Sequence, residues 1–219
     1  MQNFASDVAF TSAVKSVQLE KGSRDGYARM ERGRGWQTRV TPALTQFLSE
    51  LDMFYLGTAN AVGQPYIQYR GGPPGFLKVV DDQTLGFADF DGNRQYITLG
   101  NLSENSQAFI FLMDYANRRR VKLWGSAKVV ENDQALLEQL RDPTYPGNVE
   151  RAILFTIEAW DINCSQHIHT RYSQTQIEPI IEQLQQRISQ LEAELTSLRE
   201  RTSHIPPATE ANTLPHSKD

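Results

Sequence analysis

The sequence predicts a β-dominated α+β protein with short helices, in which antiparallel strands form a closed or nearly closed barrel followed by a coiled-coil helix. Two observations indicate the barrel. Short apolar runs follow one another closely between residues 53 and 90 with turn residues between them. Residues 120–130 alternate between small or apolar residues and mostly polar ones. A heptad pattern of Ile and Leu after residue 176 indicates the coiled coil. A sheet this apolar would leave exposed edges unless it closed on itself.

Composition excludes several classes of protein. The 219 residues are 39% hydrophobic and 22% charged, enough for one sizeable core with an appendage. The net charge of −4 disfavours a nucleic-acid partner, which usually requires a basic excess. A lone Cys164 excludes an intrachain disulfide and points to a reducing compartment. Because no apolar run approaches the roughly 18 residues of a membrane span, we expect a cytoplasmic protein without a membrane partner.

Two segments precede the strands. Residues 1–40 are expected to form an arm, with a possible amphipathic helix in FASDVAFTSAVKSVQ and a polar, Gly-rich stretch after it. A barrel domain is expected over residues 41–172. It begins with a helix at Thr41-Pro42, because Thr suits the N-cap and Pro suits the first helical position. This helix should bury the face carrying Leu44, Phe47, Leu48 and Leu51.

The predicted strands share β-forming residues bounded by turn residues. They are MFYLGTA, PYIQYR, FLKVV, Leu85–Phe90, Ala108–Met113, Arg120–Val130 and Arg151–Ile162, with a short helix in 132–141. In the sixth strand Val121, Leu123, Gly125, Ala127 and Val129 should face the core. The opposite face should meet water, a ligand or a partner subunit. The basic run Arg118–Arg120 is expected to face solvent.

The heptad segment spans residues 175–201. Its apolar residues recur at alternating steps of four and three: Ile177, Ile181, Leu184, Ile188, Leu191, Leu195 and Leu198. With mostly Ile at a and Leu at d, the pattern favours a parallel two-stranded coil and hence a homodimer. An amphipathic helix packed on its own barrel is the alternative. Residues 202–219, which are rich in Pro and poor in apolar side chains, are expected to be a disordered tail.

A candidate anion site lies in residues 84–106. A strand, the turn Asp91-Gly92 and a helix starting near Asn93 would place free backbone N–H groups beside Arg94. The Arg94 guanidinium could grip phosphate oxygens bidentately. The alternative is an ordinary connection whose Arg is a solvated surface charge.

Five motifs in the same order resemble the pyridoxamine 5′-phosphate oxidase-related, FMN-binding split-barrel family, in particular an uncharacterised flavoprotein branch. They are G-x-P-Y-x-Q-x-R-G-G-P-P-G-F-L at Gly63–Leu77, F-A-D-x-x-G-N-R-Q-Y at Phe87–Tyr96, G-N-L-x-x-N at Gly100–Asn105, F-L-M-D-Y at Phe111–Tyr115 and N-C-x-Q-H-I at Asn163–Ile168. The resemblance implies a split barrel that binds FMN at a dimer interface.

The resemblance also assigns cofactor-binding residues. The family's Ser-Arg-Lys triplet, which holds the FMN phosphate, corresponds to Asn93, Arg94 and Gln95. The strand that runs along the isoalloxazine and ribityl groups corresponds to Gln68, Tyr69 and Arg70. Gly71 would allow close approach of a flat ligand, although a tight turn explains it equally well. A Gln that reaches FMN from the second subunit is replaced by Arg120, and Trp124 shares the face of Arg120.

We expect FMN-dependent redox of an unidentified small molecule, with His167 and Arg171 as candidate catalytic residues. Where the resemblance implies an Arg-x-His near the C-terminus of the domain, this chain has His167-Ile168-His169-Thr170-Arg171, which disfavours pyridoxamine phosphate as substrate. No metal site is expected from Cys164, His167 and His169, since no fourth ligand is evident. Two alternatives stay open: a non-catalytic flavin or haem storage module, and a deazaflavin in place of FMN.

Overall fold

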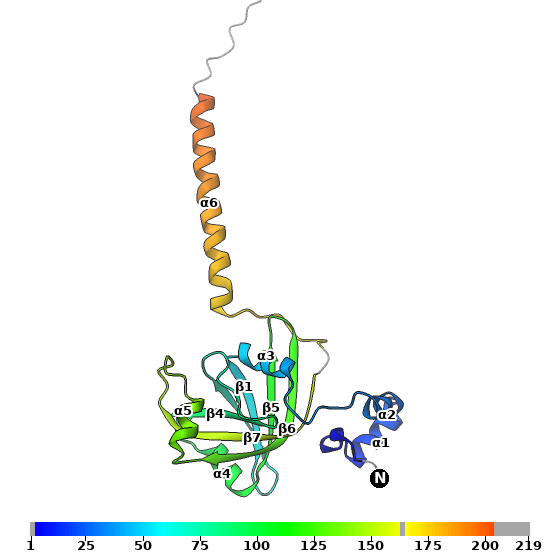
Figure 1. Ribbon diagram of the computed structural model, residues 1–219. Helices are drawn as coiled ribbons and strands as arrows, with labels where there is room; N and C mark the ends of the chain where they lie inside the picture. Colours follow the sequence, from blue (N-terminus) through cyan, green and yellow to red (C-terminus); the bar gives the residue numbers. More distant parts are fainter. Residues whose placement is uncertain (1–2, 163–164, 204–219) are drawn as a thin grey trace, which may run out of the picture. The chain divides into compact units, whose positions relative to one another are not determined.

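The computed structural model describes residues 3–162 and 165–203. The chain divides into two units, Met1–Thr170 and Arg171–Asp219. The first unit contains the helices η1 (Ala5–Val8), α1 (Ser12–Glu20), α2 (Arg24–Arg32), α3 (Pro42–Glu50), α4 (Ile97–Glu104) and α5 (Gln134–Leu140), and the strands β1 (Met53–Ala59), β2 (Pro65–Gly71), β3 (Lys78–Val79), β4 (Thr84–Phe90), β5 (Gln107–Asp114), β6 (Arg119–Val130) and β7 (Val149–Ile162) (Figure 1). The second unit contains α6 (Gln174–Ser203).

The strands form one antiparallel seven-stranded sheet in the order β2-β1-β5-β6-β7-β4-β3. The sheet is curved (Figure 1). The strand order places β2 and β3 at its two edges, and among the described residues they are not paired with each other. The prediction of a β-dominated, antiparallel split barrel is therefore confirmed. Of the predicted strand FLKVV only Lys78–Val79 pairs, because Phe76 and Leu77 are buried in the core instead.

The core consists of alternate residues of the strands. Ile110, Leu123, Ile153, Phe155 and Ile157 are fully buried, and the predicted inward face of β6 is confirmed by its alternating burial. Removing such side chains from water is the main stabilising contribution, about 1.5–3 kcal/mol for each large apolar side chain.

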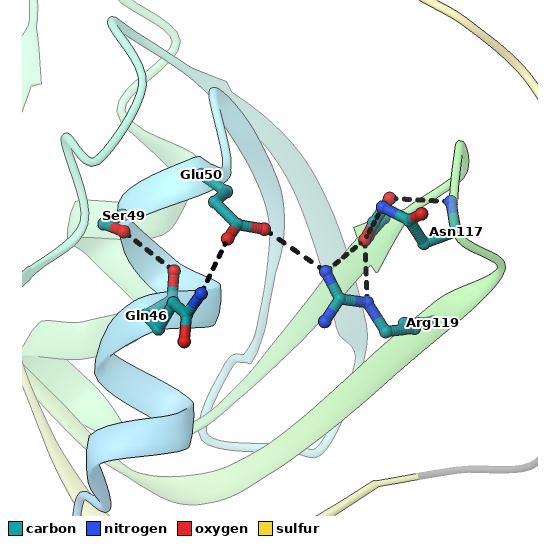
Figure 2. A network of polar contacts seen from close by, with 6 residues as sticks. Gln46, Ser49, Glu50, Asn117 and Arg119 are labelled. Atoms are coloured by element: carbon teal, nitrogen blue, oxygen red, sulfur yellow. Dashed lines mark hydrogen bonds and ion pairs between the residues drawn. The ribbon is translucent and has the colours of Figure 1, made fainter.

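The helix α3 closes part of this core and begins where predicted. The Thr41 hydroxyl accepts a hydrogen bond from the Leu44 N–H at 3.3 Å, and Pro42 follows the cap. Near the end of α3, the Glu50 carboxylate accepts a hydrogen bond from Arg119 at 3.2 Å (Figure 2). Arg119, a member of the basic run and the first residue of β6, also donates to Asp114 at 2.7 Å. Its two hydrogen bonds therefore connect α3 to the β5–β6 turn.

The segment before α3 is attached to the outer face of the sheet. The Trp36 ring stacks on Trp124 with centroids 4.6 Å apart. Gln37 and Trp160 exchange two backbone hydrogen bonds of 3.1 and 2.7 Å. The polar stretch, for which no helix was expected, forms α2, where the buried Glu31 accepts a hydrogen bond from Ser6 at 3.0 Å. This tertiary contact explains a helix that the local sequence does not predict.

The unit after residue 170 is dominated by the 30-residue α6. No helix among residues 3–162 and 165–203 is long and apolar enough to cross a membrane. Most of the tail predicted to be disordered, residues 204–219, lies outside the described residues.

Gly125 occupies an irregularity of the sheet, where the register between β6 and β7 shifts. A Cβ atom at this position would lie 2.0 Å from the Thr156 carbonyl oxygen, which is closer than van der Waals contact allows. We expect Gly125→Ala to lower the free energy of unfolding by ~2–3 kcal/mol, because the backbone of β7 must move. Urea denaturation measures this change.

Gly100→Ala is the control for this variant. Gly100 lies in α4 and a Cβ there meets nothing within 4 Å, so the substitution should stabilise by ~1 kcal/mol or less. Equal effects of the two substitutions would contradict the close contact at Gly125.

Candidate functional site

A polar cavity of about 260 Å³ lies where β2, β4, β7 and the start of α4 meet. Its lining is rich in hydrogen-bonding and charged side chains from three separate parts of the sequence. The lining residues are Tyr66, Gln68, Arg70, Asp89, Phe90, Gly92, Asn93, Arg94, Gln95, Tyr96, Ile97, Thr98, Leu99, Glu150 and Arg151. The cavity therefore contains arginines from β2, from the turn after β4 and from β7.

Asp89 is one of the two acidic residues, among those described, that line this cavity. It is buried and forms an ion pair with Arg70. Its other oxygen lies 3.9 Å from Nη1 of Arg151, the residue directly opposite Asp89 in the β4–β7 ladder. Arg151 also donates to Glu150 at 2.5 Å. The Nε atoms of both arginines are buried and have no hydrogen-bond partner within the described residues. The Nε of Arg151 lies 3.5 Å from Oε1 of Glu131, so this guanidinium group is close to three carboxylates, those of Asp89, Glu131 and Glu150.

Burial raises the pKa of the Asp89 carboxyl, and the charges of Arg70 and Arg151 oppose this effect. When Asp89 is protonated, neither guanidinium group has its charge balanced by this residue. The cavity is then more positive and better suited to a negatively charged ligand.

The turn after β4 differs from the predicted geometry. Helix α4 begins at Ile97, so the prediction of a helix starting near Asn93 is wrong by four residues. The Asn93 side chain instead accepts a hydrogen bond from the Gln95 N–H at 3.2 Å, and Arg94 and Tyr96 have φ angles of 56° and 54°. A left-handed residue cannot lie inside a right-handed helix, so α4 begins only after Tyr96, which is its N-cap residue.

The first turn of α4 still faces the cavity, because Ile97, Thr98 and Leu99 line it. Two side-chain hydrogen bonds hold α4 against the barrel. The Thr98 hydroxyl donates to Oε1 of Gln68 at 2.7 Å, and Nδ2 of Asn101 donates to the Thr58 hydroxyl at 3.0 Å. These contacts fix the start of α4, where a helix has unpaired N–H groups, beside the cavity.

The structure brings together five of the predicted cofactor-binding residues in this cavity: Gln68, Arg70, Asn93, Arg94 and Gln95. The Arg94 side chain is exposed at the cavity and makes no hydrogen bond or ion pair with the described part of the chain.

Three further predicted residues do not line the cavity but lie on the outer face of the sheet: Tyr69, Arg120 and Trp124. Tyr69 is exposed, and Trp124 is stacked on Trp36. Arg120 has a buried Nε without a hydrogen-bond partner in the described residues. Within one chain, this set and the cavity are on opposite faces of the sheet.

The remaining candidates do not line the cavity either. A Cβ atom at Gly71 would lie 2.9 Å from the Tyr69 ring, so a contact within the chain already accounts for this glycine. His167 is exposed with a φ of 61°, and Arg171 belongs to the second unit. Cys164 lies outside the described residues, among which no cluster of three metal-ligating side chains occurs.

Sequence reasoning missed Arg151, Asp89 and Glu150. A signal existed for Asp89, since it is the charged residue in the otherwise apolar run LGFADF and a buried carboxylate requires a partner. No comparable local signal marks Arg151, because its partner on β4 is brought to it only by strand pairing.

The pKa of Asp89 leads to a prediction about pH. A carboxyl group whose pKa is raised on folding contributes stability below its unfolded pKa that is lost as pH rises through its folded pKa. We expect the free energy of unfolding of the wild-type chain, relative to Asp89→Asn, to fall as the pH rises above about 4, the ordinary pKa of an Asp carboxyl. Denaturant titrations across this range measure the difference. A difference that increases with pH would mean that the arginines outweigh burial.

Several solved structures resemble this chain. An FMN-binding protein from Syntrophomonas wolfei is 14% identical, with a TM-score of 0.45 over 67% of this chain and 97% of that chain. HupZ from Group A Streptococcus is 14% identical, with a TM-score of 0.44 over 61% of this chain and 99% of that one. HutZ, a haem storage protein from Vibrio cholerae, is 17% identical, with a TM-score of 0.40 over 57% and 94%. No curated protein matches the chain.

A family model described as pyridoxamine 5′-phosphate oxidase matches residues 40–164. This range contains all seven strands and the entire cavity, and it covers more than half of the chain. The chain belongs to the pyridoxamine 5′-phosphate oxidase family, which confirms the resemblance of its motifs.

Proposed function

We propose that this protein binds FMN and is an FMN-dependent oxidoreductase acting on a small molecule. The observation that carries the proposal is the cavity beside the first turn of α4, where Arg94 is available for a ligand and Arg70 and Arg151 line the same volume. Backbone N–H groups at a helix start and guanidinium groups are the donors that bind phosphate in proteins.

The charges of the cavity fit a terminal phosphate. Arg70 is paired with Asp89, and Arg151 with Asp89, Glu131 and Glu150, whereas Arg94 has no carboxylate partner in the described part of the chain, so its charge is the one available to a phosphate. Where the family has a Lys after its Arg, this chain has Gln95. Arg151 supplies a second cationic group near that position and would compensate for the missing Lys.

Bound FMN would supply the redox chemistry, and the protein would supply binding, orientation and electrostatics. Gln68 is held by Thr98 in a fixed orientation at the cavity and could contact the ribityl chain. Arg120 and Trp124 lie on the other face of the sheet, so they would reach this flavin only from a second copy of the chain. The proposal therefore includes a homodimer whose sites are each completed by the partner.

His167 and Arg171 remain proposed substrate-side residues, and the cytoplasm remains the proposed compartment because the chain has a single cysteine. The alternative function is a flavin or haem binding module without turnover. A Soret band in the absorbance spectrum of the purified protein would favour haem, whereas twin flavin bands would favour FMN.

We expect Arg94→Ala to weaken FMN binding about tenfold to a hundredfold, because it removes a charge-assisted contact to the phosphate. Quenching of flavin fluorescence measures the affinity, and riboflavin, which lacks the phosphate, should bind both proteins equally. Arg29→Ala, on an exposed position of α2, is the matched control and should leave FMN affinity unchanged. Equal FMN affinity of wild type and Arg94→Ala would exclude this turn as the phosphate site.

A second experiment tests the shared site. Arg94→Ala and Arg120→Ala chains with different affinity tags are co-expressed, and the heterodimer is purified. If each site takes Arg94 from one chain and Arg120 from the other, one site of the heterodimer is intact and the other lacks both arginines. We expect flavin at about half of the sites in the heterodimer and little in either homodimer. No gain of flavin in the heterodimer would mean that both arginines of a site come from the same chain, or that neither of them binds flavin.

A further inference from the structure

Helix α6 exposes an apolar stripe. Its heptad residues are between 36% exposed (Ile177) and 58% exposed (Leu184), and Ile181, Ile188 and Leu191 are also among the exposed large side chains. Most helical stability in proteins comes from the packing of an apolar face, so a 30-residue helix with this stripe uncovered requires a partner.

We propose that α6 pairs with α6 of a second copy of this chain as a parallel, two-stranded coiled coil. The a positions are Ile181, Ile188 and Leu195, and the d positions include Leu184, Leu191 and Leu198. Ile at a with Leu at d is the combination that favours two parallel strands.

Charges beside the stripe identify a second copy as the occupant. In a parallel coil each g residue faces the e residue that follows five positions later in the partner helix. Arg187 at g would face Glu192 at e, and Glu194 at g would face Arg199 at e. Both contacts join opposite charges, and each occurs twice because the pair is symmetric.

The remaining sequence of α6 is compatible with this pairing. Pro179 lies inside the helix but occupies an f position, on the side away from the stripe, so it interrupts no a or d residue. Arg187 donates only to Gln190 of its own helix, at 3.3 Å, which leaves it able to contact a partner.

The inference is independent of the flavin site. The coiled coil would join the C-terminal units of two chains whether or not the barrel binds FMN. The test therefore uses readouts that involve no flavin, so that its failure leaves the proposed cofactor function untouched.

Cysteine cross-linking of the full chain tests the pairing. In a Cys164→Ser background, Leu191→Cys places the only thiol at a d position, where equivalent residues of parallel helices face each other. Ala193→Cys, at an outward f position of the same helix, is the matched control. We expect Leu191→Cys to form a disulfide-linked dimer in a glutathione buffer and Ala193→Cys to stay monomeric on a non-reducing gel.

Charge reversal tests the direction of the helices. Added to Leu191→Cys, Arg187→Glu places two Glu side chains opposite each other, and dimer cross-linking should become about tenfold weaker against glutathione. The double reversal Arg187→Glu with Glu192→Arg should restore cross-linking, because the parallel contact is again between opposite charges. In an antiparallel pair, where g faces g, the second change would not restore it.

Several results would overturn the inference. Equal cross-linking at positions 191 and 193 would indicate chance encounters of tethered helices. Absence of cross-linking at 191 would indicate a helix covered by its own chain. A trimeric mass in sedimentation, or failure of the double reversal to restore cross-linking, would exclude the parallel two-stranded coil.

Discussion

An ion pair between Arg70 on β2 and Asp89 on β4 joins two strands that are far apart in the sheet order. The backbone ladder leaves the barrel open between its edge strands, so side chains rather than backbone hydrogen bonds connect β2 to β4. Pairing a buried carboxylate with arginine avoids the cost of an isolated buried charge. The result is a cavity between β2 and β4, where a closed barrel would have paired strands.

The chemistry of the cavity follows from this arrangement. Asp89 holds Arg70 on one side and Arg151 on the other, while Thr98 holds Gln68 and sets the start of α4 against β2. Three arginines and the first residues of α4 therefore line one cavity. Because the protein positions these groups before any ligand arrives, little reorganisation would be needed to bind an anion.

Much of the fold was predictable from residue order, because hydrophobic period and turn chemistry are local properties. The helix cap at Thr41 and the alternating faces of β6 were predicted correctly, and the residues assigned to a cofactor at Asn93–Gln95, Gln68 and Arg70 line one cavity. Errors arose where nonlocal contacts outweigh local preference. Helix α2 is an example, since it is supported by the buried Glu31. The error at α4 has a different origin: Arg94 and Tyr96 adopt left-handed backbone conformations, and the helix begins after them.

The sequence by itself determined the fold class, the family, the heptad pattern of α6 and the Arg-containing turn. Each of these follows from residue types that recur at short spacing along the chain. Tertiary structure alone decided that Arg151 joins the cavity and that Arg120 and Trp124 lie on the opposite face of the sheet. Strand pairing and sheet curvature bring together residues that are distant in the chain, and no local pattern records which strands will become neighbours.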